Sequence, residues 1–113
     1  MRSMFNRAFF EDLHRRLRNY FHRFPNAESA VILIHTNEAE YLLVDIIEAD
    51  DQFITFVHWP REIADLPKRW ADVEDSLAAA TIPYSEIRSV HFDPRLARGR
   101  EIGFTKSGRK LVS

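Results

Sequence analysis

The side chains that most often carry out chemistry in enzymes are spread along this sequence without the spacing that a catalytic site requires. Ser85, Glu86 and His91 lie close together, but no Gly-x-Ser-x-Gly turn presents the serine, and nothing orders the three groups as nucleophile, base and orienting acid. The segment GRKLVS at residues 108–113 lacks the upstream glycine of a phosphate-binding loop. The paired acids at residues 50–51 suit a hairpin turn. We therefore predict a protein that is not an enzyme and that binds no cofactor.

The five histidines are not spaced as metal ligands. His14 and His22 lie on a predicted helix, where their separation places them about 80° apart around the axis. His35, His58 and His91 fall on different predicted strands, and a lone strand histidine is far more often hydrogen-bonded or exposed than a ligand. The sequence contains no cysteine, which excludes disulfides, thiolate metal sites and cysteine nucleophiles. We predict no metal site.

Length and composition indicate a single domain over residues 1–113. A chain of this length, with 45% hydrophobic residues and nine phenylalanines, can bury one core without cross-links. No apolar run is long enough to cross a bilayer, and the first residues lack the apolar stretch and cleavage site of a secretory signal. We expect a soluble, cytoplasmic protein.

The net charge of −1 hides three segments of alternating sign. Residues 1–23 carry a net charge of +4, residues 24–87 carry −10, and residues 88–113 carry +5. Basic ends around an acidic middle can form a nucleic-acid or membrane patch, or they can pack against acidic parts of the same chain or of a second copy. The second basic group consists of Arg88, Arg95, Arg98, Arg100, Arg109 and Lys110.

Residues 4–24 are predicted to form one amphipathic helix. At about 100° per residue, its large apolar side chains fall within an arc of about 160°. These side chains are Phe5, Phe9, Phe10, Leu13, Leu17, Tyr20, Phe21 and Phe24. Pro25 ends the helix, because proline disfavours helical geometry in the preceding residue. The apolar face would cover a sheet, and the opposite face, with Arg15 and Arg18, would be solvated or would contact nucleic acid or a membrane interface.

Three predicted strands follow, at residues 30–36, 40–49 and 52–59. Their short connections indicate an antiparallel meander. The strands are apolar on both faces, so both faces need cover. In the second strand the two expected faces are Leu42, Val44 and Ile46 against Tyr41, Leu43 and Ile47. The N-terminal helix can cover one face of the sheet, and the other needs a curled barrel interior or a neighbouring subunit.

Residues 61–80 are predicted to be a helical insertion between the third and fourth strands. Their apolar residues recur every three or four positions. These residues are Ile63, Leu66, Trp70, Val73 and Leu77. A short strand then ends at Tyr84, and a single turn leads to a fifth strand that ends at residue 93. The basic segment 94–113 is expected to form a hairpin over residues 106–108 or a loose tail.

The order of these elements is a helix, three meandering strands, a short fourth strand, a tight turn and a fifth strand, and it resembles the Sm-like fold, a small SH3-like barrel. The segment IIEADDQFITFV at residues 46–57 resembles the Hfq-type members of this family, in which an acidic turn precedes Asp-Gln-Phe and an apolar strand. The segment IPYSEIRSV at residues 82–90 resembles their second motif, with Tyr84 at the aromatic position. The resemblance implies an α+β fold, in which an N-terminal amphipathic helix precedes a strongly bent antiparallel five-stranded sheet or small barrel. It also implies RNA contacts by Gln52 and Phe53.

The sequence departs from the family pattern at two places. Asp45 stands where the family bends its second strand at a glycine, the residue that relieves sharp bending of a strand. Ser85 and Glu86 stand where the family presents a Lys-His pair to uridine-rich RNA. A carboxylate at that place would repel a phosphate.

We predict a non-catalytic binding or assembly module that associates with itself or with a protein partner. Aromatic residues are enriched at contact surfaces. The predicted interface residues are Trp59, Trp70, Phe53 and Val57. The alternative is an Sm-like RNA-binding protein that uses the basic helix and the basic C-terminal segment. Its predicted RNA contacts are Gln52, Phe53, Arg15, Arg18, Arg98 and Arg100.

Overall fold

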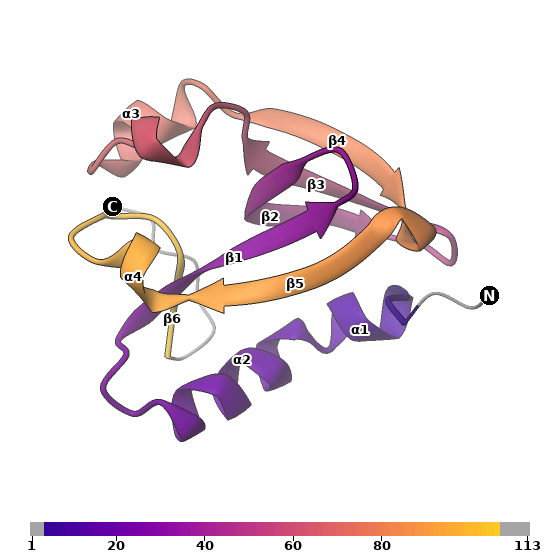
Figure 1. The fold of residues 1–113 in the computed structure, drawn as a ribbon, viewed down its shortest axis with the longest axis horizontal. Helices are drawn as coiled ribbons and strands as arrows, with labels where there is room; N and C mark the ends of the chain where they lie inside the picture. The colour runs from indigo at the N-terminus through magenta and orange to yellow at the C-terminus, as the bar shows by residue number, and fades with distance from the viewer. Residues whose placement is uncertain (1–3, 107–113) are drawn as a thin grey trace.

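The computed structural model describes residues 4–106, which form an α+β fold around a six-stranded antiparallel sheet (Figure 1). The strands are β1 (Ser29–Thr36), β2 (Glu40–Ala49), β3 (Phe53–Trp59), β4 (Ala78–Pro83), β5 (Ile87–Asp93) and β6 (Phe104–Thr105). Their order is β4-β3-β2-β1-β5, and β6 pairs with the start of β1. The predicted α+β class with an antiparallel sheet is confirmed. No pairing among the described residues joins β4 to β5, so the sheet is open.

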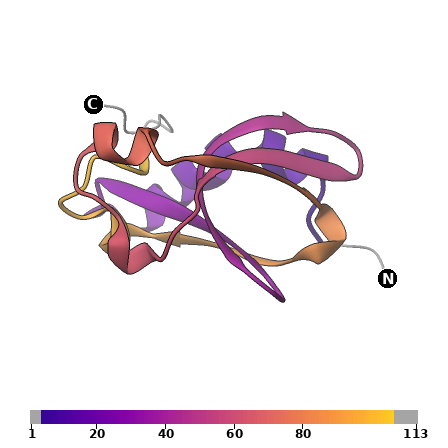
Figure 2. The same cartoon turned by 90° about the horizontal axis from the view of Figure 1, so that it is seen from above.

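Strand β2 bends because its pairing with β3 shifts register twice, between Leu43 and Asp45 and between Ile46 and Glu48. Each shift adds one residue to β2 that has no partner in β3, which turns the following side chains to the other face and increases the local twist. Seen from above, the strands curve strongly (Figure 2). The bulges therefore bend a strand that contains no glycine.

The predicted alternation of side chains along β2 is wrong after Val44. Ile46 packs in the same core as Leu43 instead of sharing a face with Leu42, and Ile47 is 59% exposed. The bulges are the physical reason, since each one skips a step of the two-residue repeat. Strand β3 has no extra residue on its own side of the pair, and its side chains alternate between two clusters: Ile54 and Phe56 pack in one, and Val57 and Trp59 in the other.

The N-terminal segment forms two helices, α1 (Arg7–Glu11) and α2 (Leu13–Arg23), where one helix over residues 4–24 was predicted. The break lies at Asp12, whose φ of −96° and ψ of 10° leave helical geometry. Aspartate has a low helix propensity because its side chain competes for nearby hydrogen-bonding groups. Here the Asp12 carboxylate binds the guanidinium of Arg15, which lowers the pKa of Asp12.

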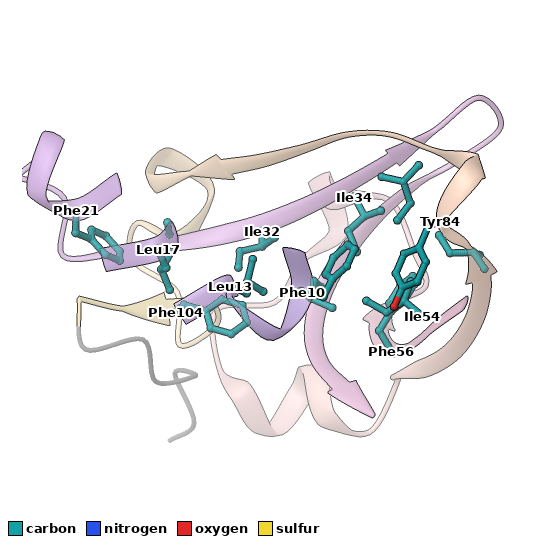
Figure 3. Packing of buried hydrophobic residues seen from close by; sticks show 14 residues of the cluster. Phe10, Leu13, Leu17, Phe21, Ile32, Ile34, Ile54, Phe56, Tyr84 and Phe104 are labelled. Atoms are coloured by element: carbon teal, nitrogen blue, oxygen red, sulfur yellow. The ribbon is translucent and has the colours of Figure 1, made fainter. Parts of the chain in front are cut away.

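The apolar side of α1 and α2 covers one face of the curved sheet (Figure 3). Its buried members are Phe10, Leu13, Leu17 and Phe21, which pack with Ile32, Ile34, Ile54, Phe56, Tyr84 and Phe104 in a cluster that we call the first core. Phe5, Phe9 and Tyr20 are partly buried at its margin. Phe24 is 55% exposed, so the predicted apolar face is one residue too long at its C-terminal end.

The opposite face of the sheet is covered by the chain's own insertion and C-terminal segment. The insertion folds as η1 (Ile63–Asp65) and α3 (Trp70–Glu74), and it is shorter than predicted because β4 begins at Ala78. The resulting second core consists of Val31, Leu33, Leu42, Val44, Trp59, Leu66, Trp70, Val73, Ala97 and Ile102. The expectation that this face needs a barrel interior or a neighbouring subunit is therefore wrong.

The C-terminal segment locks the insertion in place. After the short helix α4 (Pro94–Ala97), the N–H of Glu101 donates to the carbonyl of Lys68 at 2.8 Å. The carboxylate of Glu101 accepts from the N–H of Trp70, the first residue of α3, at 3.0 Å. The predicted hairpin over residues 106–108 lies for the most part outside the described residues.

The β2–β3 turn is held by the carboxylate of Asp50. Its Oδ1 accepts hydrogen bonds from the N–H groups of Phe53 at 2.7 Å and Gln52 at 2.9 Å. The hydroxyl of Tyr84, in the one-turn helix η2 (Tyr84–Glu86), donates to the Asp50 carbonyl at 2.7 Å. The two backbone N–H groups lower the pKa of Asp50, because they favour its charged form.

Acid should weaken this turn. A carboxyl whose pKa is lowered by folding stabilises the native state above its ordinary pKa of about 3.9, and that contribution is lost as the pH falls through the lower folded value. Asp50→Asn keeps a side-chain oxygen that does not titrate. We expect urea unfolding from about pH 5 to pH 2 to show a shallower loss of stability in Asp50→Asn than in the unaltered protein. Equal slopes would mean that the Asp50 charge has no role in the turn.

Candidate functional site

The predicted interface residues are not gathered on a surface. Trp59 and Trp70 are 4% and 8% exposed in the second core, and the indole N–H of Trp59 donates to the Glu62 carbonyl at 3.1 Å. Val57 is half-buried beside them, and Phe53, at 41% exposed, is on the surface. The assignment of the two tryptophans to an interface is therefore corrected: the insertion folds back and buries them.

The predicted RNA-binding residues also fail to form one surface. Gln52 and Phe53 lie at the β2–β3 turn, and α4 with the arginines after it lies at the other end of the long axis (Figure 1). Residues 37–51, which lead into that turn, contain six acidic residues and no lysine or arginine. Arg15 is paired with Asp12. The structure thus separates Gln52 and Phe53 from Arg98 and Arg100. Arg7 does approach the turn, but it is paired with Glu11 and Asp51.

A groove with a basic lining lies where the end of α2, the start of β1 and α4 meet. It is open and has a volume of about 940 Å³. Four arginines, Arg23, Arg95, Arg98 and Arg100, line it together with Phe24. Arg98 and Arg100 were among the predicted contacts. Arg23 belongs to the predicted basic helix, but only the fold brings the end of α2 beside α4.

A cluster of polar residues lies on β1, β2 and β5. The Nε2 of His35 is 3.0 Å from a carboxylate oxygen of Glu40, and the hydroxyl of Ser89 is hydrogen-bonded to Nε2 of His91 at 2.9 Å. The two imidazole rings are 4.5 Å apart. A serine beside a histidine needs an acid that orients the base and donors for an oxyanion before it can act as a nucleophile. Within residues 4–106 no three metal-binding side chains are placed to hold a metal ion.

Strand β4 forms an open end of the sheet. It pairs with β3 alone among the described strands, and its sequence AAATIP carries no charged side chain. Ala79 and Thr81 are exposed, and the Thr81 hydroxyl is hydrogen-bonded to that of Thr55 at 2.8 Å. Edge strands are usually protected by charges, bulges or a covering segment, because their free N–H and C=O groups accept further strands. Pro83, at the last position, is the one protective feature in β4.

Comparisons with protein-family models, with curated proteins and with solved structures found no match. In the part of the chain that the structure describes, no helix combines the length and the apolar character needed to cross a membrane.

Proposed function

We propose that this protein is a non-catalytic assembly module that associates with copies of itself through the open edge of its sheet. The observation that carries the proposal is β4, an edge strand with no charged residue in a chain that is otherwise rich in charge. Strand addition at such an edge gains backbone hydrogen bonds along its whole length. The order of the elements and the one-turn η2 between β4 and β5 support an Sm-like or SH3-like topology for the module. The absence of cysteine supports a cytoplasmic location.

Charge favours a head-to-tail contact in which β4 of one copy adds to β5 of the next. Residues 70–87, which contain α3 and β4, carry four acidic residues and no lysine or arginine. Residues 88–100, which contain most of β5 and all of α4, carry four arginines and one aspartate. A symmetric contact between two β4 edges would bring like charges together, whereas the β4–β5 contact brings opposite charges together. Repeated head-to-tail contacts give a ring if the rotation closes, and otherwise a filament.

The test is a measurement of mass by size-exclusion chromatography with light scattering. The unaltered protein should elute at micromolar concentration as a multiple of its 13.3 kDa chain mass. Ala79→Lys places a charge on the exposed side of the edge and should yield the monomer, because edge lysines block strand addition. The matched control is Ala8→Lys, which makes the same change at an exposed position of α1, outside the acidic segment, and should leave the mass unchanged.

The dependence of the measured mass on salt concentration is a second, independent test. A head-to-tail contact between opposite charges should weaken as salt rises, because ions screen the attraction. A clean monomer of the unaltered protein would end the proposal. Assembly that strengthens with salt would instead indicate the symmetric contact between like-charged edges.

A further inference from the structure

The groove of four arginines is a built feature of the fold, and no residue of β4 lines it. Arg23 is the last residue of α2, and the other three arginines come from α4 and the turn that follows it. The Asp93 carboxylate accepts from the N–H of Arg95 at 2.9 Å and so caps α4, which begins with Pro94. Gly99, with a φ of +73°, then turns the chain between Arg98 and Arg100. This turn lets three arginines within six residues reach one groove.

The arginines of the groove keep most of their hydrogen-bonding capacity for a ligand. The Nε of Arg95 is 3.5 Å from Asp93, and the Nε of Arg100 donates to the Leu66 carbonyl at 3.4 Å. Arg23 and Arg98 have no ion-pair partner within residues 4–106. Glu28 is the acidic member of the described lining, so the groove carries an excess of positive charge. Each guanidinium is a planar fork of donors that matches the oxygens of a phosphate.

Phe24 adds an aromatic surface to the same groove. Its side chain is 55% exposed although it belongs to an otherwise buried apolar series along α2. An exposed phenylalanine alone needs no explanation. An exposed ring beside several arginines is the combination that binds nucleotides, because bases stack on aromatic rings while phosphates bind guanidinium groups.

The basic surface does not continue along α2 as a long track. Arg15 is paired with Asp12, and the guanidinium of Arg16 lies over the ring of Phe9 at 4.4 Å. Four arginines instead gather around the groove, whose volume of about 940 Å³ lies within the range of small-molecule sites. A local groove suits a compact polyanion better than an extended strand.

We propose that this groove binds a nucleoside polyphosphate, with its phosphates on Arg23, Arg95, Arg98 and Arg100 and its base stacked on Phe24. The phosphates would supply the negative charge that the groove lacks. The site would bind the nucleotide as a ligand, without a bond being formed or broken. Arg95, Arg98 and Arg100 also contribute to the positive charge of the head-to-tail contact. Ligand binding nevertheless does not require a second copy, since no residue of β4 lines the groove.

Titration calorimetry with ADP and with inorganic pyrophosphate tests both parts of the site. Arg98→Gln should weaken the binding of both compounds about tenfold or more, because each loses a charge-assisted contact. Phe24→Ala should weaken the binding of ADP about tenfold and leave the affinity for pyrophosphate unchanged, because only the nucleotide has a base to stack. Glu28→Gln should strengthen the binding of pyrophosphate, because it removes a negative charge from the lining of the groove. The matched control is Arg18→Gln, which changes an exposed arginine of α2 outside the groove and should leave both affinities unchanged.

Several results would overturn the proposal. One is an unaltered protein that binds neither compound, and another is an Arg18→Gln variant that weakens binding as much as Arg98→Gln does. If Phe24→Ala left the affinity for ADP unchanged, the base would not be stacked on Phe24. A single-stranded oligonucleotide that binds far more tightly than ADP, with the same dependence on Arg98, would show that the groove serves a nucleic-acid strand instead. Circular dichroism of each variant separates loss of the site from loss of the fold.

Discussion

Replacing Phe21 by alanine should lower the free energy of unfolding by about 3–5 kcal/mol. Phe21 is 5% exposed, and its ring packs in the first core between α2 and the sheet (Figure 3). The substitution removes the transfer free energy of the ring and leaves a cavity that the surrounding side chains fill only in part. Urea denaturation followed by circular dichroism measures the change, provided that the slope with denaturant is unaltered.

Phe24→Ala is the matched control for this prediction. It makes the same substitution one turn further along, at a ring that is 55% exposed. We expect a loss of less than about 1 kcal/mol, since little apolar surface leaves the interior. Similar losses in both variants would contradict the packing of α2 on the sheet, because the two rings would then have the same surroundings.

Replacing Gly103 by alanine should cost about 2–5 kcal/mol of unfolding free energy. Gly103 precedes β6 and has a φ of +119°, a conformation that side chains disfavour. A Cβ atom built there would lie 2.7 Å from the backbone oxygen of Ala30 in β1. Because backbone atoms within a paired strand cannot move aside cheaply, the methyl group should separate β6 from β1.

Gly99→Ala separates the effect of the clash from that of the backbone conformation. Gly99 also has a positive φ, of +73°, but a Cβ atom there would meet no other atom within 4 Å. We expect a loss of about 1–2 kcal/mol, which is the cost of a left-handed conformation alone. The same denaturation experiment measures both variants. If Gly103→Ala were no worse than Gly99→Ala, the close approach of β6 to β1 would be in doubt.

The strands β1 to β5 were predictable because each depends on local patterns, whereas α4 and β6 were not predicted. The bounds of β2, 40–49, follow from an apolar run between two turn signals, and its antiparallel pairing with β3 follows from the short connection at Asp50 and Asp51. The apolar series of the first helices places Leu13 and Leu17 in the core as expected. The break at Asp12 was not predicted, because one residue of low propensity does not interrupt an otherwise regular apolar pattern.

The features that were not predictable depend on contacts between distant segments. The two bulges in β2 arise from its pairing with β3, and the sequence pattern of Val44, Ile46 and Ile47 does not predict them. Trp59 and Trp70 fit an interface and a core equally well until the insertion is known to fold back over the sheet. The expectation of a neighbouring subunit arose from that missing cover.

The candidate sites also depend on contacts between distant segments, which the sequence alone does not predict. Arg98 and Arg100 could be singled out as basic residues, but their convergence with Arg23 and Phe24 depends on how α4 packs near the end of α2. The pairing of Ser89 with His91 likewise depends on side-chain orientation along β5. Charge and residue type indicate which groups can bind anions, and only the fold determines which of them act together.

The pairing of β6 with β1 also affects how the protein folds during its synthesis on the ribosome. Phe104 belongs to the first core and Ile102 to the second, so neither can be completed before these residues have been synthesised and have left the exit tunnel. Until then the nascent chain exposes the apolar surface of its first strand, which molecular chaperones recognise. Folding of this chain must therefore largely wait for the translation of its last described strand.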